Sequence, residues 1–234
     1  MRFKLENINN IQHADINLDG IAVITGVNES GKSTIARVLC AVCAINDKKV
    51  NSLFYDEDIT LINTQGHVVL ADQNKTYSLS FSKGYKFKTR TPISNNDSIV
   101  LNRTLLKLKG VLPRGAFKRL ISDGRIQHNG FLVIDEPETH LHPSRQLEAA
   151  EAIVMMRKQF GLHVLLTTNS PYFLHAMEVY SAYHKIADQC FYYLAVSKDG
   201  GIEFENVNGN IDKIYKEFLA PIQKLEVVEA EIDE

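Results

Sequence analysis

The segment Gly26-Val-Asn-Glu-Ser-Gly-Lys-Ser-Thr34 constrains the fold more than any other part of the chain. It fits the pattern G-x-x-x-x-G-K-[ST], in which a glycine-rich loop points backbone N–H groups at phosphate. The apolar run 21–25 before it is typical of a buried strand, and apolar residues then recur at helical spacing from Ile35 to Val42. The sequence therefore predicts a strand, a phosphate loop and a helix in that order.

The loop pattern assigns individual roles. Its lysine reaches the β- and γ-phosphates and the hydroxyl that follows holds Mg²⁺, which predicts these roles for Lys32 and Ser33. The expected ligands are therefore ATP and Mg²⁺. The residues expected to bind the nucleotide are Gly26, Asn28, Glu29, Ser30, Gly31, Lys32, Ser33 and Thr34.

A second motif supplies the carboxylates that the phosphate loop lacks. The apolar run Phe131–Ile134 ends in Asp135-Glu136-Pro137. A carboxylate at the end of a buried strand can meet the Mg²⁺ held by Ser33, so Asp135 is the predicted second metal ligand. Glu136 is placed to orient or deprotonate the attacking water. The two motifs together predict an ATPase.

Several segments together resemble a known family. The run Asp135-Glu-Pro-Glu-Thr-His-Leu-His-Pro143, the apolar strand 163–168 and the segment Asn169-Ser-Pro-Tyr172 resemble the ABC-type ATPase heads of the OLD, RecF and SMC group. More narrowly, they resemble bacterial AAA-family ATPases of phage-defence and overcoming-lysogenization systems. The resemblance extends from Phe3 to about Lys224. It implies a dimer in which each nucleotide lies between one head's phosphate loop and the other head's signature segment.

The chain departs from this family at two places. Asn169 stands where the family has a histidine that contacts the γ-phosphate; its amide can still donate a hydrogen bond but cannot carry a proton. The segment 108–115, expected to act as the signature, contains glycine but no serine. Lys109 and Arg114 are candidate substitutes. Slow hydrolysis and a site completed by another protein both remain open, and Asn169 is retained with Lys32 and Glu136 as a candidate catalytic residue.

The predicted fold class is α/β, a P-loop NTPase similar to an ABC-ATPase head. It has a mostly parallel core sheet, an antiparallel edge sheet and a small helical lobe, and the gap between the two motifs is too short for a coiled-coil insertion. We expect a single domain over the whole chain. Its parts are a phosphate-loop and antiparallel lobe (1–90), a small helical lobe (91–126), the remaining core half (127–226) and a frayed acidic tail (227–234).

Composition agrees with one cytoplasmic domain. The 234 residues are 44% hydrophobic, yet no stretch reaches the roughly 18 apolar residues of a membrane span. The cysteine pair Cys40 and Cys43 has no second ligand pair and is expected in the core. Charge is uneven: residues 83–125 hold eleven Lys/Arg and two Asp, hence +9, which leaves −11 for the rest of a chain of net charge −2. This basic segment binds either nucleic acid or an acidic protein surface.

His140 and His142 suggest two roles, a metal site or a contact with the nucleotide or the interface between heads. Glu138 either joins that interface or caps the following helix. For the whole chain we favour a switch subunit that assembles around ATP as a homodimer or hetero-oligomer and controls an effector encoded nearby, a toxin or nuclease. The alternatives are an ATPase that acts directly on nucleic acid in repair, and the ATPase subunit of a transporter.

Overall fold

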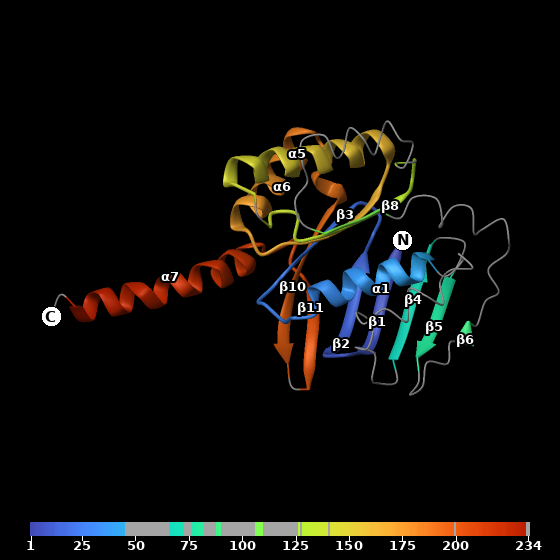
Figure 1. Cartoon of the computed structure of the whole chain (residues 1–234), viewed down its shortest axis with the longest axis horizontal. Coiled ribbons are helices and arrows are strands. Elements are labelled where there is room, and N and C mark those ends of the chain that lie inside the picture. Colours follow the sequence, from blue (N-terminus) through green and yellow to red (C-terminus); the bar gives the residue numbers. More distant parts are fainter. Residues whose placement is uncertain are drawn as a thin grey trace.

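The computed structural model describes residues 1–44, 66–72, 76–81, 88–89, 106–109, 126, 128–139, 141–198 and 200–232. Its strands form one mixed sheet, and helices pack on both faces (Figure 1). The strands are β1 (Arg2–Ile8), β2 (Ile11–Asn17), β3 (Ile21–Thr25), β4 (Gly66–Ala71), β5 (Thr76–Phe81), β6 (Lys88–Thr89), β7 (Leu106–Lys109), β8 (Phe131–Asp135), β9 (His163–Thr167), β10 (Cys190–Lys198) and β11 (Gly201–Asn206). The helices are α1 (Lys32–Ala44), α5 (Pro143–Phe160), α6 (Pro171–Tyr183) and α7 (Asp212–Ile232), with a short 3₁₀ helix η2 (Ala187–Gln189).

The sheet has a parallel and an antiparallel half, as the sequence predicts. In spatial order the described strands run β6-β5-β4-β1-β2-β11-β10-β3-β9-β8-β7. Neighbours from β10 to β7 are parallel, whereas β6, β5, β4, β1 and β2 form an antiparallel meander. Every residue of β3 and of β8 is buried, which explains why both read as unbroken apolar runs.

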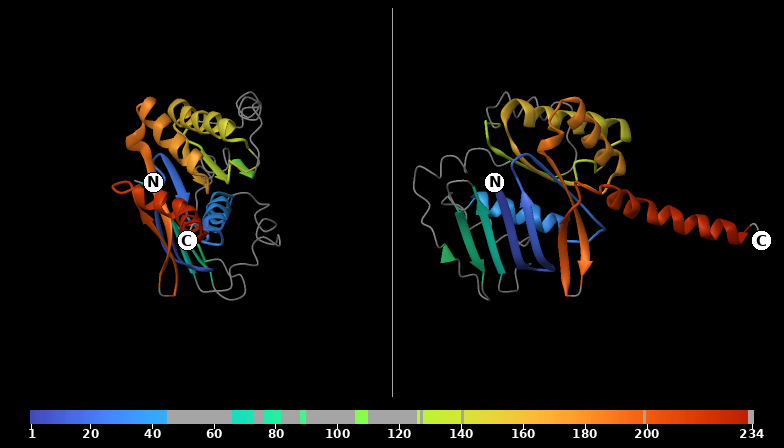
Figure 2. Two further views of the ribbon diagram at one scale, coloured as in Figure 1. Left: turned by 90° about the vertical axis from the view of Figure 1, so that its left-hand side faces the viewer. Right: turned by 180° about the vertical axis from the view of Figure 1, so that it is seen from behind.

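Alternate residues of β3 face two different cores. Ala22 and Ile24 belong to a cluster that includes Ile35 and Leu39 of α1. Ile21 and Val23 belong to a second cluster with residues of α5, α6 and the beginning of α7. Because successive side chains of a strand point to opposite faces, α1 covers one face of the sheet and α5 and α6 cover the other. Figure 2 shows these helices on either side of the strands.

The two helices after the second motif are bounded by residues suited to helix ends. Helix α5 ends at Gly161, which adopts the left-handed conformation (φ +67°) and donates its N–H to the carbonyl of Arg157. Ser170 caps α6, because its hydroxyl accepts a hydrogen bond from the N–H of Phe173, and Pro171 follows in the first turn.

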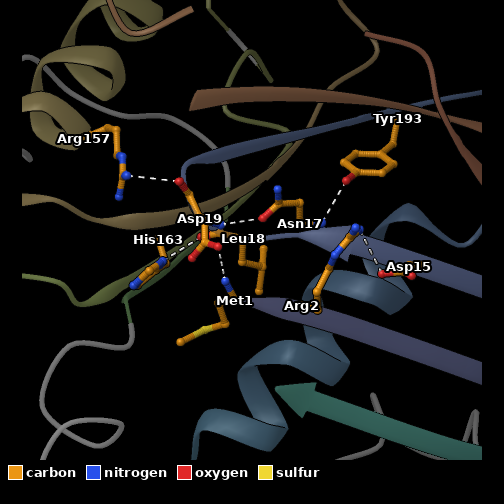
Figure 3. Close-up of polar contacts among 9 residues, drawn as sticks. All are labelled: Met1, Arg2, Asp15, Asn17, Leu18, Asp19, Arg157, His163 and Tyr193. Carbon is orange, nitrogen blue, oxygen red and sulfur yellow. Dashed lines mark hydrogen bonds and ion pairs between the residues drawn. The ribbon is translucent and has the colours of Figure 1, made fainter. Parts of the chain in front are cut away.

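The ends of the central strands away from the phosphate loop are held by polar contacts (Figure 3). The guanidinium of Arg157 donates to the carbonyls of Asp19, Gly161 and Leu162 at 2.8–3.1 Å. The amino group of Met1 forms an ion pair with the Asp19 carboxylate. These bonds tie α5 to the loop before β3, at the opposite end of that strand from the motif loops.

Three expectations need correction. Residues 106–109, expected in the small helical lobe, form strand β7 beside β8; Ile126 is the other described residue of that lobe. Strand β11 was not expected, although Ile202 and Phe204 alternate with polar residues. Helix α7 continues to Ile232, so residues 227–232 are helical and not a frayed tail, because they retain good helix formers and an apolar period. No described helix is both long and apolar enough to cross a membrane.

Candidate nucleotide site

The loop between β3 and α1 depends on its two glycines. Gly26 and Gly31 have φ values of +144° and +80°, a region that side chains disfavour. A Cβ atom on Gly26 would lie 2.7 Å from the Cβ of Ala195, and one on Gly31 would lie 2.9 Å from Cγ1 of Ile11. The loop is also tied to the β1–β2 turn, where Asn10 donates its amide to the Glu29 carbonyl at 2.9 Å. Packing therefore fixes the loop's curvature.

The Lys32 ammonium group lies within this loop. It donates to the carbonyls of Gly26 at 2.8 Å and Val27 at 2.7 Å. Burial lowers the pKa of Lys32, and the nearby carboxylates of Glu136 and Asp135 oppose that shift. The cation is thus held among acceptors at the point where a phosphate is expected.

Ser33 and Asp135 come together as the sequence predicts. The Ser33 hydroxyl donates to Oδ1 of Asp135 at 3.0 Å. Oδ1 also accepts a hydrogen bond of 2.7 Å from the hydroxyl of Thr167, which lies opposite Asp135 in the β8–β9 register. The sequence does not predict this role of Thr167, since nothing in the motif indicates which residue of the neighbouring strand supports the carboxylate.

Glu136 occupies an unusual backbone conformation. Its φ is +49°, which is uncommon for a residue other than glycine. The conformation is stabilised because the Glu136 N–H donates to the carbonyl and the hydroxyl of Thr167, at 3.1 and 3.0 Å. Strain of this kind clusters at functional sites. The backbone therefore aims Glu136 in a direction that an ordinary strand end would not give it.

Asn169 links Glu136 to the phosphate loop. Its Nδ2 donates to Oε1 of Glu136 at 3.3 Å and to Oδ1 of Asn28 at 3.2 Å. Its own Oδ1 is buried and has no hydrogen-bond partner among the described residues. A buried acceptor without a donor is costly, so this oxygen is available to a water or ligand group.

Glu138 holds the Asn169 backbone in place. One carboxylate oxygen accepts the Asn169 N–H at 2.7 Å, and the other is buried without a partner in the described part of the chain. Burial raises the pKa of Glu138, an effect that the Asn169 N–H opposes and the Glu136 charge reinforces. Glu138 does not cap α5. That position belongs to His142, whose ring accepts a hydrogen bond from the Ser144 N–H.

The phosphate loop from Asn28 to Thr34 and Glu136 line a cleft of about 490 Å³, within the range of small-molecule sites. Asn9 and Asn10 of the β1–β2 turn and Arg37 of α1 complete its lining. Arg37 follows Ser33 by one helical turn. Neither Asn9 nor Arg37 was singled out in the sequence, because both lie outside the loop pattern.

The donors present fit ATP and Mg²⁺. Backbone N–H groups and Lys32 suit phosphate oxygens, and the Ser33 hydroxyl and Asp135 carboxylate are the hard oxygen ligands that Mg²⁺ prefers. The metal role considered for the histidines has no support, since no group of three or more potential ligands is found in the described ranges, which exclude His140. Of the candidate signature residues, Lys109 lies in β7 with its backbone beside Asp135, and Arg114 lies outside the described residues.

Comparison with known proteins agrees with this geometry. A family profile described as "AAA domain" matches residues 2–135, more than half of the chain and all of the segment from β1 to Asp135. No curated protein matches the chain.

Three solved structures show the same fold. The SMC head domain from Thermotoga maritima has a TM-score of 0.52 at 11% identity and covers 88% of this chain and 98% of its own. An SmcHead bound to the C-winged helix domain of ScpA has a TM-score of 0.55 at 10% identity and covers 88% of this chain and 97% of its own. An Smc head domain with an extended coiled coil, bound to the C-terminal domain of ScpA derived from Pyrococcus furiosus, has a TM-score of 0.55 at 7% identity. It covers 100% of this chain and 99% of its own. At these identities the likeness establishes the fold, an SMC-head-like P-loop NTPase, and nothing finer.

Proposed function

The chain belongs to the AAA domain family, and we propose that it binds ATP with Mg²⁺ and hydrolyses the γ-phosphate. The observation that carries this proposal is the Ser33–Asp135 hydrogen bond of 3.0 Å, which joins the two ATP motifs across 102 residues. Glu136, the next residue, lines the same cleft as the phosphate loop. Two candidate metal ligands and a candidate base thus lie together at one end of the parallel strands.

The proposed chemistry divides among the described side chains. Lys32 and the loop N–H groups bind the phosphates, while Ser33 and Asp135 hold Mg²⁺. When bound, Mg²⁺ would neutralise charge on the phosphate oxygens. Glu136 accepts a proton from water as the water oxygen attacks the γ-phosphorus, and the bond to the bridging oxygen breaks to release ADP.

Asn169 acts on this step through Glu136. Its Nδ2–H donates to one Glu136 oxygen, which leaves the other free for water, and its unpartnered Oδ1 is a second acceptor at the same place. A water that donates one hydrogen to each oxygen would be fixed in orientation before the reaction. An asparagine, which takes up no proton, is sufficient for this role.

The ATPase proposal is tested by nucleotide binding and phosphate release in purified protein. Wild type should bind ATP more tightly with Mg²⁺ than without it and release phosphate. Lys32→Ala should lose binding, whereas Lys185→Ala, in the turn after α6, should behave as wild type. The proposal would be contradicted if the wild-type protein bound no nucleotide under any of these conditions.

We further propose that the ATP cycle controls a separate effector in anti-phage defence. This role is supported by the resemblance of the segment 135–143 to phage-defence ATPases. Two of the similar structures are described as SMC heads bound to ScpA, so this fold is able to serve as a docking platform for another protein. Co-purification with the neighbouring gene product, with and without ATP, tests the idea; a chain that cycled ATP and bound no neighbour would contradict it.

The nucleic-acid alternative rests on the +9 charge of residues 83–125, most of which lie outside the described residues. Replacing Lys107, Lys109, Lys118 and Arg119 with Glu would abolish binding if this segment contacts phosphates, and the wild-type affinity would fall steeply with salt. No binding at low salt would assign the segment to a protein interface.

A further inference from the structure

Helix α7 carries one apolar face along its whole length. Apolar residues recur at intervals of three or four, which places them within about a third of the helix circumference. We call this face the α7 stripe. It consists of Ile211, immediately before the helix, and Ile214, Phe218, Ile222, Leu225, Val228 and Ile232.

The first part of the stripe is used within the chain. Ile214 is fully buried, and Ile211 and Phe218 pack against the core cluster shared with α6. The hydroxyl of Tyr215 donates to the Glu178 carboxylate of α6, which fixes the beginning of α7 to the sheet and its other helices. We call the sheet with these helices the body of the protein. The body of the protein therefore lies on the stripe side of the helix.

The second part of the stripe is exposed. Ile222, Leu225, Val228 and Ile232 have 52%, 63%, 51% and 76% of their surface accessible, and no described residue covers them. The helix here projects away from the sheet and the other helices (Figures 1 and 2). Four large apolar side chains in one exposed row mark an interaction surface.

We propose that a second copy of this chain covers the exposed part of the α7 stripe, with the two α7 helices antiparallel. A twofold contact uses the same patch on both copies, so each exposed stripe is buried by the other. Leu225 of each copy then lies against the partner's Val228, in the alternating packing of two helices whose apolar residues recur every 3.5 residues.

The position of the body excludes a parallel pair. Because each body lies on the stripe side at the beginning of α7, two parallel helices that joined their stripes would bring both bodies into the same space. In an antiparallel pair the bodies lie at opposite ends, and only the projecting parts overlap. In the proposed register the contact is centred between Leu225 and Val228.

The charges on one flank of the stripe complement each other in this arrangement. Lys224 and Glu231 are seven residues apart and lie on the same flank. Antiparallel pairing places Lys224 beside the partner's Glu231, and the twofold axis repeats the contact. Glu226, Glu229 and Glu231 also sit near the negative end of the helix dipole, an unfavourable position that a cation from the partner would relieve.

Light scattering on the full chain tests the pair without nucleotide, so that an ATP-dependent assembly does not contribute. The mass should rise from 26.4 kDa towards twice that value as the concentration increases to about 100 µM. Leu225→Glu should stay at the mass of one chain. Val227→Glu is the matched control, because Val227 is 62% exposed but points away from the stripe; it should dimerise like wild type.

A charge exchange tests the orientation. Lys224→Glu should weaken the dimer at least severalfold, and Lys224→Glu with Glu231→Lys should restore it. Restoration by Lys224→Glu with Glu229→Lys instead would indicate parallel helices and overturn the arrangement. The proposal is also overturned if wild type has the mass of one chain at every concentration, or if Leu225→Glu and Val227→Glu have equal effects.

Discussion

The hydroxyl of Ser33 donates a 3.0 Å hydrogen bond to the carboxylate of Asp135, and this contact closes the space between the ends of β3 and β8. Neither residue is held by this bond alone. Ser33 is fixed by the first turn of α1, and Asp135 accepts a second hydrogen bond from Thr167 of β9. Helix α1 and strands β8 and β9 thus set the geometry of two candidate metal ligands.

Thr167→Val should raise the Mg²⁺ concentration needed for half-maximal ATP binding by about tenfold, the usual loss when the partner of a metal ligand is removed. Valine keeps the shape of threonine but leaves Asp135 without its 2.7 Å donor. Thr25→Val is the control, since Thr25 is equally buried and its hydroxyl bonds the Tyr193 carbonyl away from Asp135. Equal Mg²⁺ dependence in both variants would show that Thr167 does not support Asp135 as a metal ligand.

Asn169→Ala should lower phosphate release by about tenfold at unchanged ATP affinity, because Glu136 loses the donor that orients it. Asn169→His restores a donor and adds a group able to carry charge near the γ-phosphate, so its rate should exceed that of wild type. Steady-state assays at saturating ATP measure both. A wild-type rate in Asn169→Ala would show that another group orients Glu136.

Glu138→Gln should stabilise the folded chain at neutral pH. Burial raises the folded pKa of Glu138 above its unfolded value near 4.5, so the folded state binds the proton more tightly. The free energy of unfolding therefore falls as pH rises from 4.5 through the folded pKa. Glutamine keeps an acceptor for the Asn169 N–H and has no charge to desolvate.

Urea unfolding at several pH values measures this effect. The gain from Glu138→Gln should be largest at pH 7 and shrink as the pH approaches 4.5, while Glu6→Gln, on an exposed position of β1, should show no such trend. A gain independent of pH would mean that the ionisation of Glu138 is not its cause.

The sequence predicts the position of the candidate site residues where these are contiguous. The phosphate loop and the Asp135-Glu136 pair each lie on a short segment between recognisable elements, so the pattern determines both the residues and their place at the strand ends. Thr167 was missed because its role depends on the register between β8 and β9. The cap role considered for Glu138 is wrong, since sequence spacing does not show that this side chain reaches the Asn169 N–H. Its role at an interface between heads stays a prediction.

Errors in the fold have other causes. Strand β11 pairs antiparallel with β10, the strand directly before it, and parallel with β2, which lies about 190 residues earlier. The dipeptide Asp199-Gly200, which is typical of two-residue hairpin turns, is a local signal for the first pairing. The acidic residues after Glu226 resemble a solvated tail in composition, yet Val228 and Ile232 continue the apolar period of α7. In that segment the helical period predicted the structure better than the charge did.

Phosphate release by Glu136→Gln at saturating ATP and Mg²⁺ tests the central claim most directly. If Glu136 accepts the proton of the attacking water, the variant should bind ATP as tightly as wild type, because Lys32, Ser33 and Asp135 are intact. Its turnover should fall by a factor of about 100 or more. Turnover at the wild-type rate, or a loss of ATP affinity as large as that of Lys32→Ala, would contradict the assignment.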